Sequence, residues 1–300
     1  MELNKENKIA LIPGNRIGDD LIAMVLAYNI AKNGFDVTIF SSIIYGLKEI
    51  FPKYKIEKFP GIKNAKKALS KYDILIYQHN DNMSKDSSFP YSQNQKKLIL
   101  YGAPIYMKTK NLVDVYVDVC EDILKLSKIK RSNGVIYPKS SMFRIYKNRV
   151  IIHPTSCDIT RSWPRDKFLK VADWLIKKGY DPVFVVSPLE ECDWNNIATK
   201  YKLKVFDKLI NLAHYIYESG YMIGNDSGVG HLASTLAIPT ITLCMRPKIA
   251  KRWQPAFSPN IILLPCLPLP GPQLKLLLWT KLISCSRIFR AFRKMIIEIP

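Results

Sequence analysis

The stretch GNDSGVGHLAS at residues 224–234 concentrates residue types that bind phosphates and sugars. It combines three glycines with the carboxylate of Asp226 and with His231, one of four histidines in the chain. An apolar run precedes the stretch and a helical pattern follows it, so we expect a loop between the carboxyl end of a strand and the start of a helix. Open α/β sheets bind ligands at such loops, and the free N–H groups of a helix start favour phosphate. The stretch therefore predicts a phosphate-binding loop.

Residues 228–233 of this loop also satisfy the G-x-G-x-x-A fingerprint of dinucleotide-binding proteins. A NAD site would need an acidic residue about 20 positions later to hold the ribose. Residues 227–295 contain no Asp or Glu, which disfavours a nicotinamide enzyme and leaves open only a NADP variant that uses an arginine. Asp226 can also be a helix N-cap, and His231 a packed neutral side chain. Their coincidence with two glycines favours a ligand site.

Three segments of the chain share the order strand, loop, helix, strand. They are residues 8–40, 149–187 and 221–244. Such alternation predicts parallel sheets that are covered by helices on both faces. The order begins again near residue 149, after a basic, polar and weakly periodic stretch at 130–148. We therefore expect an α/β protein with two Rossmann-like domains that face each other across a cleft.

The composition places the chain among globular proteins, with 48% hydrophobic and 23% charged residues in 300. No run of apolar residues is long enough for a membrane span, and the polar N-terminus predicts no signal peptide. The six cysteines form no C-x-x-C pair, which is typical of a reduced cytosolic protein and argues against a zinc site or a disulfide framework.

A formal net charge of +20 predicts attraction to an anionic partner, unless it reflects only a lysine-rich surface. Nucleic acid, a membrane surface and a phosphorylated substrate are the candidate partners, but no nucleic-acid-binding motif occurs. Between residues 286 and 299, apolar residues share one helical face. The opposite face carries Arg287, Arg290, Arg293 and Lys294. This helix can pack on the protein, rest on anionic lipid, or do both.

Several motifs resemble those of glycosyltransferase family 9, the ADP-heptose:lipopolysaccharide heptosyltransferases and their relatives. The family has an Asp-(Ser/Thr)-Gly-x-x-His signature after a short strand, which SGYMIGNDSGVGHLASTLAIPTITLC resembles. IIHPTSCDITRSWPRDKFLKVADWLIKKGYDPVFVVSPLEE is similar to its stretch with a Lys/Arg-x-Trp-Pro motif, RWQPAFSPN to its Trp-x-Pro element, and RIGDDL to its Gly-Asp loop. The resemblance is strong over residues 149–260, clear at 8–40 and faint at 41–148.

The resemblance implies a GT-B-type fold and a domain order. An N-terminal acceptor domain would span residues 1–145, a nucleotide-sugar-binding domain 146–272, and a basic amphipathic helix 273–300. The implied reaction is an inverting, metal-independent transfer of a sugar, heptose from ADP-heptose, to a lipopolysaccharide or lipooligosaccharide core acceptor, without a cofactor. The partners would be the nucleotide-diphosphate sugar, the lipid-linked saccharide and the anionic inner-membrane surface, with no nucleic acid. The protein would then be cytoplasmic and peripheral on the inner face of the bacterial inner membrane.

Two residues carry the chemistry that the resemblance implies. Asp19 matches the catalytic carboxylate, which would take the proton from the acceptor hydroxyl as that oxygen attacks the anomeric carbon. Asp20 is adjacent, so one of the two can serve as a helix cap instead. Arg161 matches the basic residue of the Lys/Arg-x-Trp-Pro motif, which would hold the diphosphate and offset its developing charge.

The remaining candidates are expected to bind the donor. Asp226, Gly228 and His231 match the signature and would contact sugar hydroxyls or phosphate. Glu190 or Glu191 matches a carboxylate that contacts ribose, and the sequence does not choose between them. The donor-binding set is Thr155, Ser156, Arg161, Glu190, Asp226, Ser227, Gly228 and His231. No metal site is expected.

Alternative functions remain at this stage. A sugar-nucleotide epimerase of the same architecture would need acid and base residues on both sides of the sugar, and the sequence does not clearly supply them. A nucleic-acid-binding protein would account for the charge, and a non-catalytic family member would account for the motifs. The sugar that is transferred and its acceptor also stay open.

Overall fold

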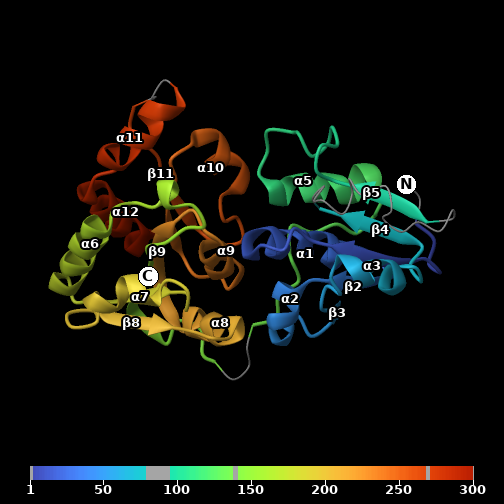
Figure 1. Ribbon diagram of the computed structural model, residues 1–300, viewed down its shortest axis with the longest axis horizontal. Coiled ribbons are helices and arrows are strands. Elements are labelled where there is room, and N and C mark those ends of the chain that lie inside the picture. Colours follow the sequence, from blue (N-terminus) through green and yellow to red (C-terminus); the bar gives the residue numbers. More distant parts are fainter. Residues whose placement is uncertain (1–2, 79–94, 138–140, 268–270, 300) are drawn as a thin grey trace. The chain divides into compact units, whose positions relative to one another are not determined.

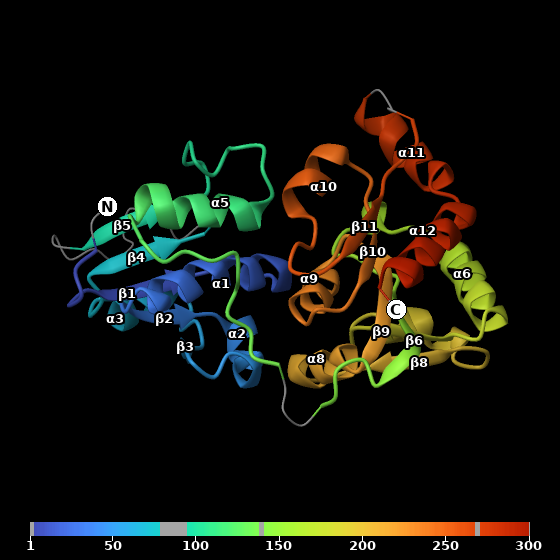
Figure 2. The same ribbon diagram turned by 180° about the vertical axis from the view of Figure 1, so that it is seen from behind.

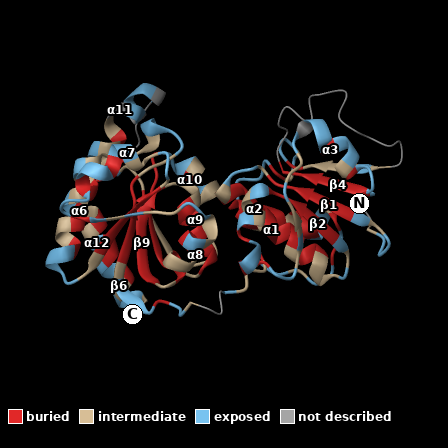
Figure 3. Cartoon of the chain, turned by 60° about the horizontal axis from the view of Figure 1, so that its bottom comes forward, coloured by how far each residue is buried: buried red, intermediate tan, exposed pale blue. Residues whose placement is uncertain are grey.

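The computed structural model describes residues 3–78, 95–137, 141–267 and 271–299. The chain divides into two compact units, Met1–Tyr137 and Pro138–Pro300, whereas the sequence placed the boundary between residues 145 and 146. Each unit contains one parallel sheet, and its strands are largely buried (Figures 1 and 3). The expected α/β class with two parallel sheets is therefore confirmed.

The N-terminal unit has a five-stranded sheet of order β3-β2-β1-β4-β5. Its strands are β1 (Lys8–Ile12), β2 (Asp36–Phe40), β3 (Lys55–Glu57), β4 (Ile74–Tyr77) and β5 (Lys96–Ile99). The chain leads from β1 to β2 and β3 on one side, and then crosses to β4 and β5 on the other side. The strand order therefore reverses between β1 and β4, which is where sheets of this kind bind ligands.

The helices of this unit are α1 (Ile17–Lys32), α2 (Ser42–Gly46), η1 (Lys48–Ile50), α3 (Ile62–Leu69), α5 (Leu112–Asp118) and the π-helical turn η2 (Val119–Ile123). Helix α1 is buried over most of its length and contacts β2, α2 and α5. Its sequence IGDDLIAMVLAYNIAK is apolar on nearly every side, as expected for a helix between other layers. The buried position fixes the first turn of α1, which contains Asp19 and Asp20.

The C-terminal unit has a six-stranded sheet of order β11-β10-β9-β6-β7-β8. Its strands are β6 (Tyr146–His153), β7 (Asp181–Val186), β8 (Lys202–Val205), β9 (Ser219–Asn225), β10 (Thr240–Leu243) and β11 (Asn260–Leu263). Here the strand order reverses between β6 and β9. Gly224 is needed at this junction, because a Cβ there would lie 2.7 Å from the carbonyl oxygen of His153.

The helices of the C-terminal unit cover both faces of its sheet (Figure 2). They are η3 (Ile159–Arg161), α6 (Arg165–Lys177), α7 (Glu191–Trp194), η4 (Asn195–Ile197), α8 (Leu209–Tyr217), α9 (Gly228–Thr235), α10 (Pro247–Trp253), α11 (Pro272–Leu282) and α12 (Cys285–Glu298). The C-terminal segment, expected as a single helix over residues 273–300, forms the two helices α11 and α12. Across the described residues, no helix has the length and apolar character that crossing a membrane requires.

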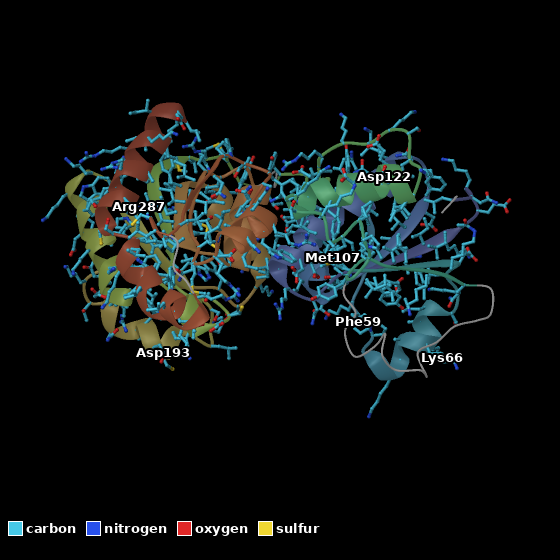
Figure 4. All side chains as sticks on the ribbon, turned by 90° about the horizontal axis from the view of Figure 1, so that it is seen from above. Phe59, Lys66, Met107, Asp122, Asp193 and Arg287 are labelled. Atoms are coloured by element: carbon cyan, nitrogen blue, oxygen red, sulfur yellow. The ribbon has the colours of Figure 1, made fainter. Side chains whose placement is uncertain are left out.

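Helix α12 packs on the C-terminal unit through its apolar face. Ile288, Phe292 and Met295 are buried in the core of this unit, and the ring of Phe289 stacks on Trp174 of α6 at 4.4 Å. Of the basic residues, Arg287 (labelled in Figure 4) is half-buried and donates hydrogen bonds from Nη1 to the carbonyl oxygens of Leu264 and Leu282. Of the placements that the sequence left open, packing on the protein is therefore observed, while Arg290, Arg293 and Lys294 are exposed.

Candidate functional site

The polar candidates of the C-terminal unit lie on the two loops that meet where its strand order reverses. Strand β6 ends at His153, which pairs with Gly224 near the end of β9. The loop after β6 leads to Arg161 and Trp163, and the loop after β9 leads through Asp226 into α9. Because β6 and β9 are parallel neighbours, both loops leave the same edge of the sheet. The sequence alone indicated each loop, and the strand pairing now makes them neighbours.

Asn225 joins these two loops. Its side chain accepts a hydrogen bond at Oδ1 from the backbone N–H of Trp163 at 3.0 Å, and its Nδ2 donates to the carbonyl oxygen of Pro154 at 2.6 Å. The residue is 1% exposed. Both partners belong to the loop after β6, so Asn225 fixes that loop relative to Asp226. Sequence reasoning missed this role, because an asparagine before an aspartate carries no signal beyond that of a loop residue.

Asp226 lies among cationic side chains at the start of α9. Its backbone N–H donates to the carbonyl oxygen of Leu243 at 3.0 Å, which ties it to the end of β10. Burial raises the pKa of its carboxyl group, while the nearby His231, Arg161 and Arg246 act in the opposite direction. The carboxylate is therefore partly desolvated, and the nearby positive charges reduce the free-energy cost of burying it.

The helix start itself has no side-chain cap. The N-cap of α9 is Ser227 and not Asp226, and the Ser227 hydroxyl makes no capping bond. Its Oγ is buried and has no hydrogen-bond partner in the described structure. Gly228 follows as the first residue of α9, and His231 is buried one turn later. The hydroxyl and the first N–H groups of α9 are thus available to an anion.

Arg161 approaches Asp226 from the loop after β6. Its Nη2 donates to Sγ of Cys157 at 2.6 Å, and its Nε lies 3.7 Å from Oδ2 of Asp158. This Nε is buried and has no hydrogen-bond partner within the described part of the chain. Hydrogen bonds from Thr160 lower the pKa of Asp158, with smaller effects from the two arginines 161 and 246. The guanidinium is therefore close to the Asp226 loop and has donor capacity left.

Thr155 and Ser156 follow the end of β6 and differ in what their hydroxyls can do. The Oγ of Ser156 donates to the carbonyl oxygen of Asp158 at 2.6 Å, so this hydroxyl stabilises its own loop. The Oγ1 of Thr155 lies 3.4 Å from Nε2 of His153. Burial lowers the pKa of His153, whose Nδ1 faces the carbonyl oxygen of Val185 at 2.8 Å. In the neutral ring, Nδ1 donates and Nε2 accepts from Thr155.

Glu190 lies beyond the end of β7, the strand next to β6. Its Oε2 accepts two hydrogen bonds from Ser187, from the backbone N–H at 2.8 Å and from Oγ at 2.7 Å. Glu191 is the first residue of α7. The ribose contact remains a prediction for either residue.

The C-terminal helices hold the loop after β6 in place. The buried indole of Trp163 donates from Nε1 to the carbonyl oxygens of Ile283 at 3.0 Å and Thr280 at 3.3 Å. In return, Nε1 of Trp279 donates to the carbonyl oxygen of Thr160 at 3.2 Å. The loop that carries Arg161 is therefore hydrogen-bonded to the last turn of α11 and to the residue that follows this helix.

In the N-terminal unit, Asp19 and Asp20 occupy the first turn of α1, beside the reversal between β1 and β4. The loop before them is closed by a hydrogen bond from the N–H of Gly14 to Oε1 of Gln78 at 3.0 Å. Asp20 is fully buried and accepts hydrogen bonds from the N–H of Arg16 and from the hydroxyl of Ser41. The N-cap of α1 is Arg16 rather than either aspartate, and the Asp20 carboxyl accepts the N–H of this N-cap residue, whereas Asp19 is 8% exposed.

The buried carboxyl of Asp20 predicts a pH dependence of stability. Desolvation raises its pKa to about 7 despite the bond from Ser41. The folded state therefore holds this proton more tightly than the unfolded state, and stability falls as pH rises from about 4 to 7, by at most about 1.4 kcal/mol per pH unit. Asparagine can keep both hydrogen bonds without a charge. The unfolding free energy of Asp20→Asn, relative to wild type, should rise between about pH 4 and 7; a constant difference in urea denaturation would contradict this.

The family assignment follows from a sequence model. Residues 109–263, just over half of the chain, match the model of glycosyltransferase family 9 (heptosyltransferase). The chain belongs to glycosyltransferase family 9. Over 102 residues it is also 31% identical to lipopolysaccharide heptosyltransferase 3 of Escherichia coli (strain K12), a match that covers 31% of this chain and 30% of that protein.

Solved structures of the family have the same fold. The glycosyltransferase family 9 protein from Veillonella parvula DSM 2008 superposes with a TM-score of 0.77 at 17% identity, covering 99% of both chains. E. coli heptosyltransferase WaaC with ADP gives 0.70 at 11% identity, covering 96% of this chain and 99% of the other. E. coli ADP-heptose lps heptosyltransferase II gives 0.67 at 15% identity, covering 97% and 99%. The prediction of a GT-B-type fold is confirmed.

The predicted site residues of this family 9 chain thus fall into two sets. The eight donor-binding candidates all lie in the C-terminal unit, on the segments after β6 and β7 and between the end of β9 and the first turn of α9, and Asp19 lies in the N-terminal unit. Their roles stay predictions. In the described residues, no three His, Cys, Asp or Glu side chains gather to form a metal site. Arg246, two residues beyond the strand-loop-helix-strand segment 221–244, is not among the site residues that the sequence predicts.

Proposed function

We propose that this family 9 protein is an inverting, metal-independent glycosyltransferase. It transfers heptose from ADP-heptose to a lipopolysaccharide or lipooligosaccharide core acceptor. The observation that carries the proposal is the meeting of Arg161, the unpartnered Ser227 hydroxyl and the start of α9 at the strand reversal of the C-terminal unit. The names of the similar proteins support the choice of donor and acceptor, since they include a heptosyltransferase with ADP and lipopolysaccharide heptosyltransferases.

The donor diphosphate would bind at the start of α9. The N–H groups of the first turn and the Ser227 hydroxyl are donors for phosphate oxygens, and Arg161 adds a fixed positive charge. When the bond between the anomeric carbon and the diphosphate oxygen breaks, negative charge grows on the leaving nucleotide. A guanidinium that is already positioned stabilises that charge without reorganisation. Asp226 and His231 would hold sugar hydroxyls or phosphate beside it.

The acceptor hydroxyl would be activated by Asp19. Its carboxylate takes the hydroxyl proton while the acceptor oxygen forms a bond to the anomeric carbon, on the face opposite the leaving diphosphate. A single displacement of this kind inverts the configuration at that carbon. The products are a lengthened saccharide, a nucleoside diphosphate and a protonated Asp19, which returns its proton to water.

The test is an assay of the purified protein with ADP-heptose and a heptose-deficient lipopolysaccharide core, with mass spectrometry of the acceptor. We expect one added heptose, an inverted linkage by NMR, and an undiminished rate in EDTA. Turnover of the nucleotide sugar without acceptor would favour an epimerase instead. Salt-sensitive DNA binding without nucleotide-sugar binding would favour a nucleic-acid-binding protein.

We also propose that the exposed basic face of α12 holds the protein at the anionic inner face of the bacterial inner membrane. Arg290 and Lys294 are exposed there, and residues 227–295 carry no acid. Reversal of both charges to Glu should weaken binding to phosphatidylglycerol vesicles at least about tenfold, since each basic residue near such a surface contributes about 1 kcal/mol. Arg287 is unsuitable for this test, because it bonds to backbone carbonyls.

The matched control reverses Lys204 and Lys208, which are exposed at and beyond the edge strand β8. It changes the net charge of the protein by the same amount. Co-sedimentation with vesicles should fall for the α12 variant alone. Equal loss in both variants would show attraction by overall charge, and no loss in either would remove the proposal.

A further inference from the structure

Arg246 reaches the Asp226 loop from the side opposite Arg161. Strand β9 lies between β6 and β10 in the sheet, so a residue that follows β10 approaches Asp226 from the other flank than one that follows β6. Leu243 at the end of β10 pairs with Asn225 and accepts the N–H of Asp226 at 3.0 Å. The chain reaches Arg246 three residues later, and α10 begins directly after it (Figure 2).

The two arginines act on the same carboxylates. Both oppose the rise that burial causes in the pKa of Asp226, and both contribute to the lowered pKa of Asp158. Arg161 is already in contact with Asp158 through its Nε. The guanidinium of Arg246 is exposed and forms no hydrogen bond or ion pair with the described residues. Its full donor capacity is therefore available to a ligand.

We propose that Arg246 binds the diphosphate of the donor from the β10 side, so that Arg161 and Arg246 bracket it, and that this second guanidinium selects a nucleoside diphosphate over a monophosphate. The inference rests on the proposed function and deepens it. A diphosphate presents two phosphate groups, and the Ser227 hydroxyl with the start of α9 lies between the two flanks. A monophosphate has one phosphate group for one flank, so it gains little from a second guanidinium.

Calorimetric titration with ADP and with AMP tests this selection. Arg246→Ala should weaken ADP binding about 10- to 100-fold, the usual cost of losing a charge-assisted hydrogen bond to phosphate, and AMP binding less than about threefold. Arg246→Lys should recover part of the loss, because it restores the charge without the fork geometry. The control is Lys251→Ala, an exposed cation at the far end of α10, which should leave both affinities within about twofold.

The outcomes separate this inference from the proposed function. Wild-type protein that binds ADP, together with an Arg246→Ala variant that binds it equally well, overturns the role of Arg246 alone. Equal weakening of ADP and AMP overturns the selection. Wild-type protein that binds neither nucleotide overturns the proposed donor class and this inference with it. Thermal unfolding of each variant shows that the C-terminal unit is intact, since Arg246 is exposed and outside the core.

Discussion

Replacement of Asp19 by asparagine is expected to lower the rate of sugar transfer by a factor of about 10²–10⁴ while nucleotide binding is retained. A positioned general base contributes an acceleration of this size, and an amide of the same shape cannot take the proton. Asp19 lies in the N-terminal unit, whereas all the donor candidates lie in the C-terminal unit. The loss should therefore appear in kcat with acceptor present, and the affinity for ADP should change less than about threefold.

Asp20→Asn is the matched control for this experiment. It removes a carboxylate from the adjacent position of the same helical turn, but asparagine can still accept from Arg16 and bond to Ser41. We expect its transfer rate to stay within about threefold of wild type. If Asp19→Asn transfers sugar at the wild-type rate, the assignment of the base is wrong. If Asp20→Asn alone loses activity, the base is the neighbouring carboxylate.

The sequence predicted the loops of the site better than the contacts between them. Loop positions follow from local patterns: an apolar run, then glycines, then a helical period. The strand order that brings the loop after β6 beside the loop after β9 depends on pairing between residues that are far apart in the chain, as in His153 with Gly224. The role of Asn225 depends on that pairing too. No local pattern distinguishes such an asparagine from a residue in an ordinary turn.

The start of α9 and the position of Arg246 were likewise not predictable from local sequence patterns. An aspartate at the start of a helical pattern is typical of an N-cap, but the N-cap of α9 is Ser227, and its hydroxyl makes no capping hydrogen bond. Arg246 was visible as one basic residue among ten in an acid-free run. Its place beside Asp226 follows from the parallel register of β9 and β10, which a single sequence does not specify. The composition showed the net positive charge, but it did not show which basic residues lie near the candidate site, which pack against the protein and which are exposed.

The buried and exposed faces of α12 predict different changes in stability when one residue of each face is replaced. Phe292 is fully buried, and its ring packs edge-on against Trp174, Tyr180 and Tyr221 at centroid distances of 6.0, 4.9 and 5.2 Å. Phe292→Ala should lower the unfolding free energy of the C-terminal unit by about 3–5 kcal/mol, because it leaves a cavity between α12, α6 and the sheet. Arg290→Ala, two residues earlier and exposed, should change it by less than about 0.5 kcal/mol.

Urea denaturation followed by tryptophan fluorescence measures both changes, since Trp174 lies beside Phe292 and Trp163 donates hydrogen bonds to the end of α11 and to Ile283 just before α12. Loss of packing at Phe292 should also loosen the loop that carries Arg161, because that loop is hydrogen-bonded to the end of α11 and to Ile283, which lead directly into α12. ADP binding should then weaken in Phe292→Ala and stay unchanged in Arg290→Ala. A Phe292→Ala protein with wild-type stability would mean that α12 is not part of the core, and that its basic residues and its apolar residues alike face an outside partner.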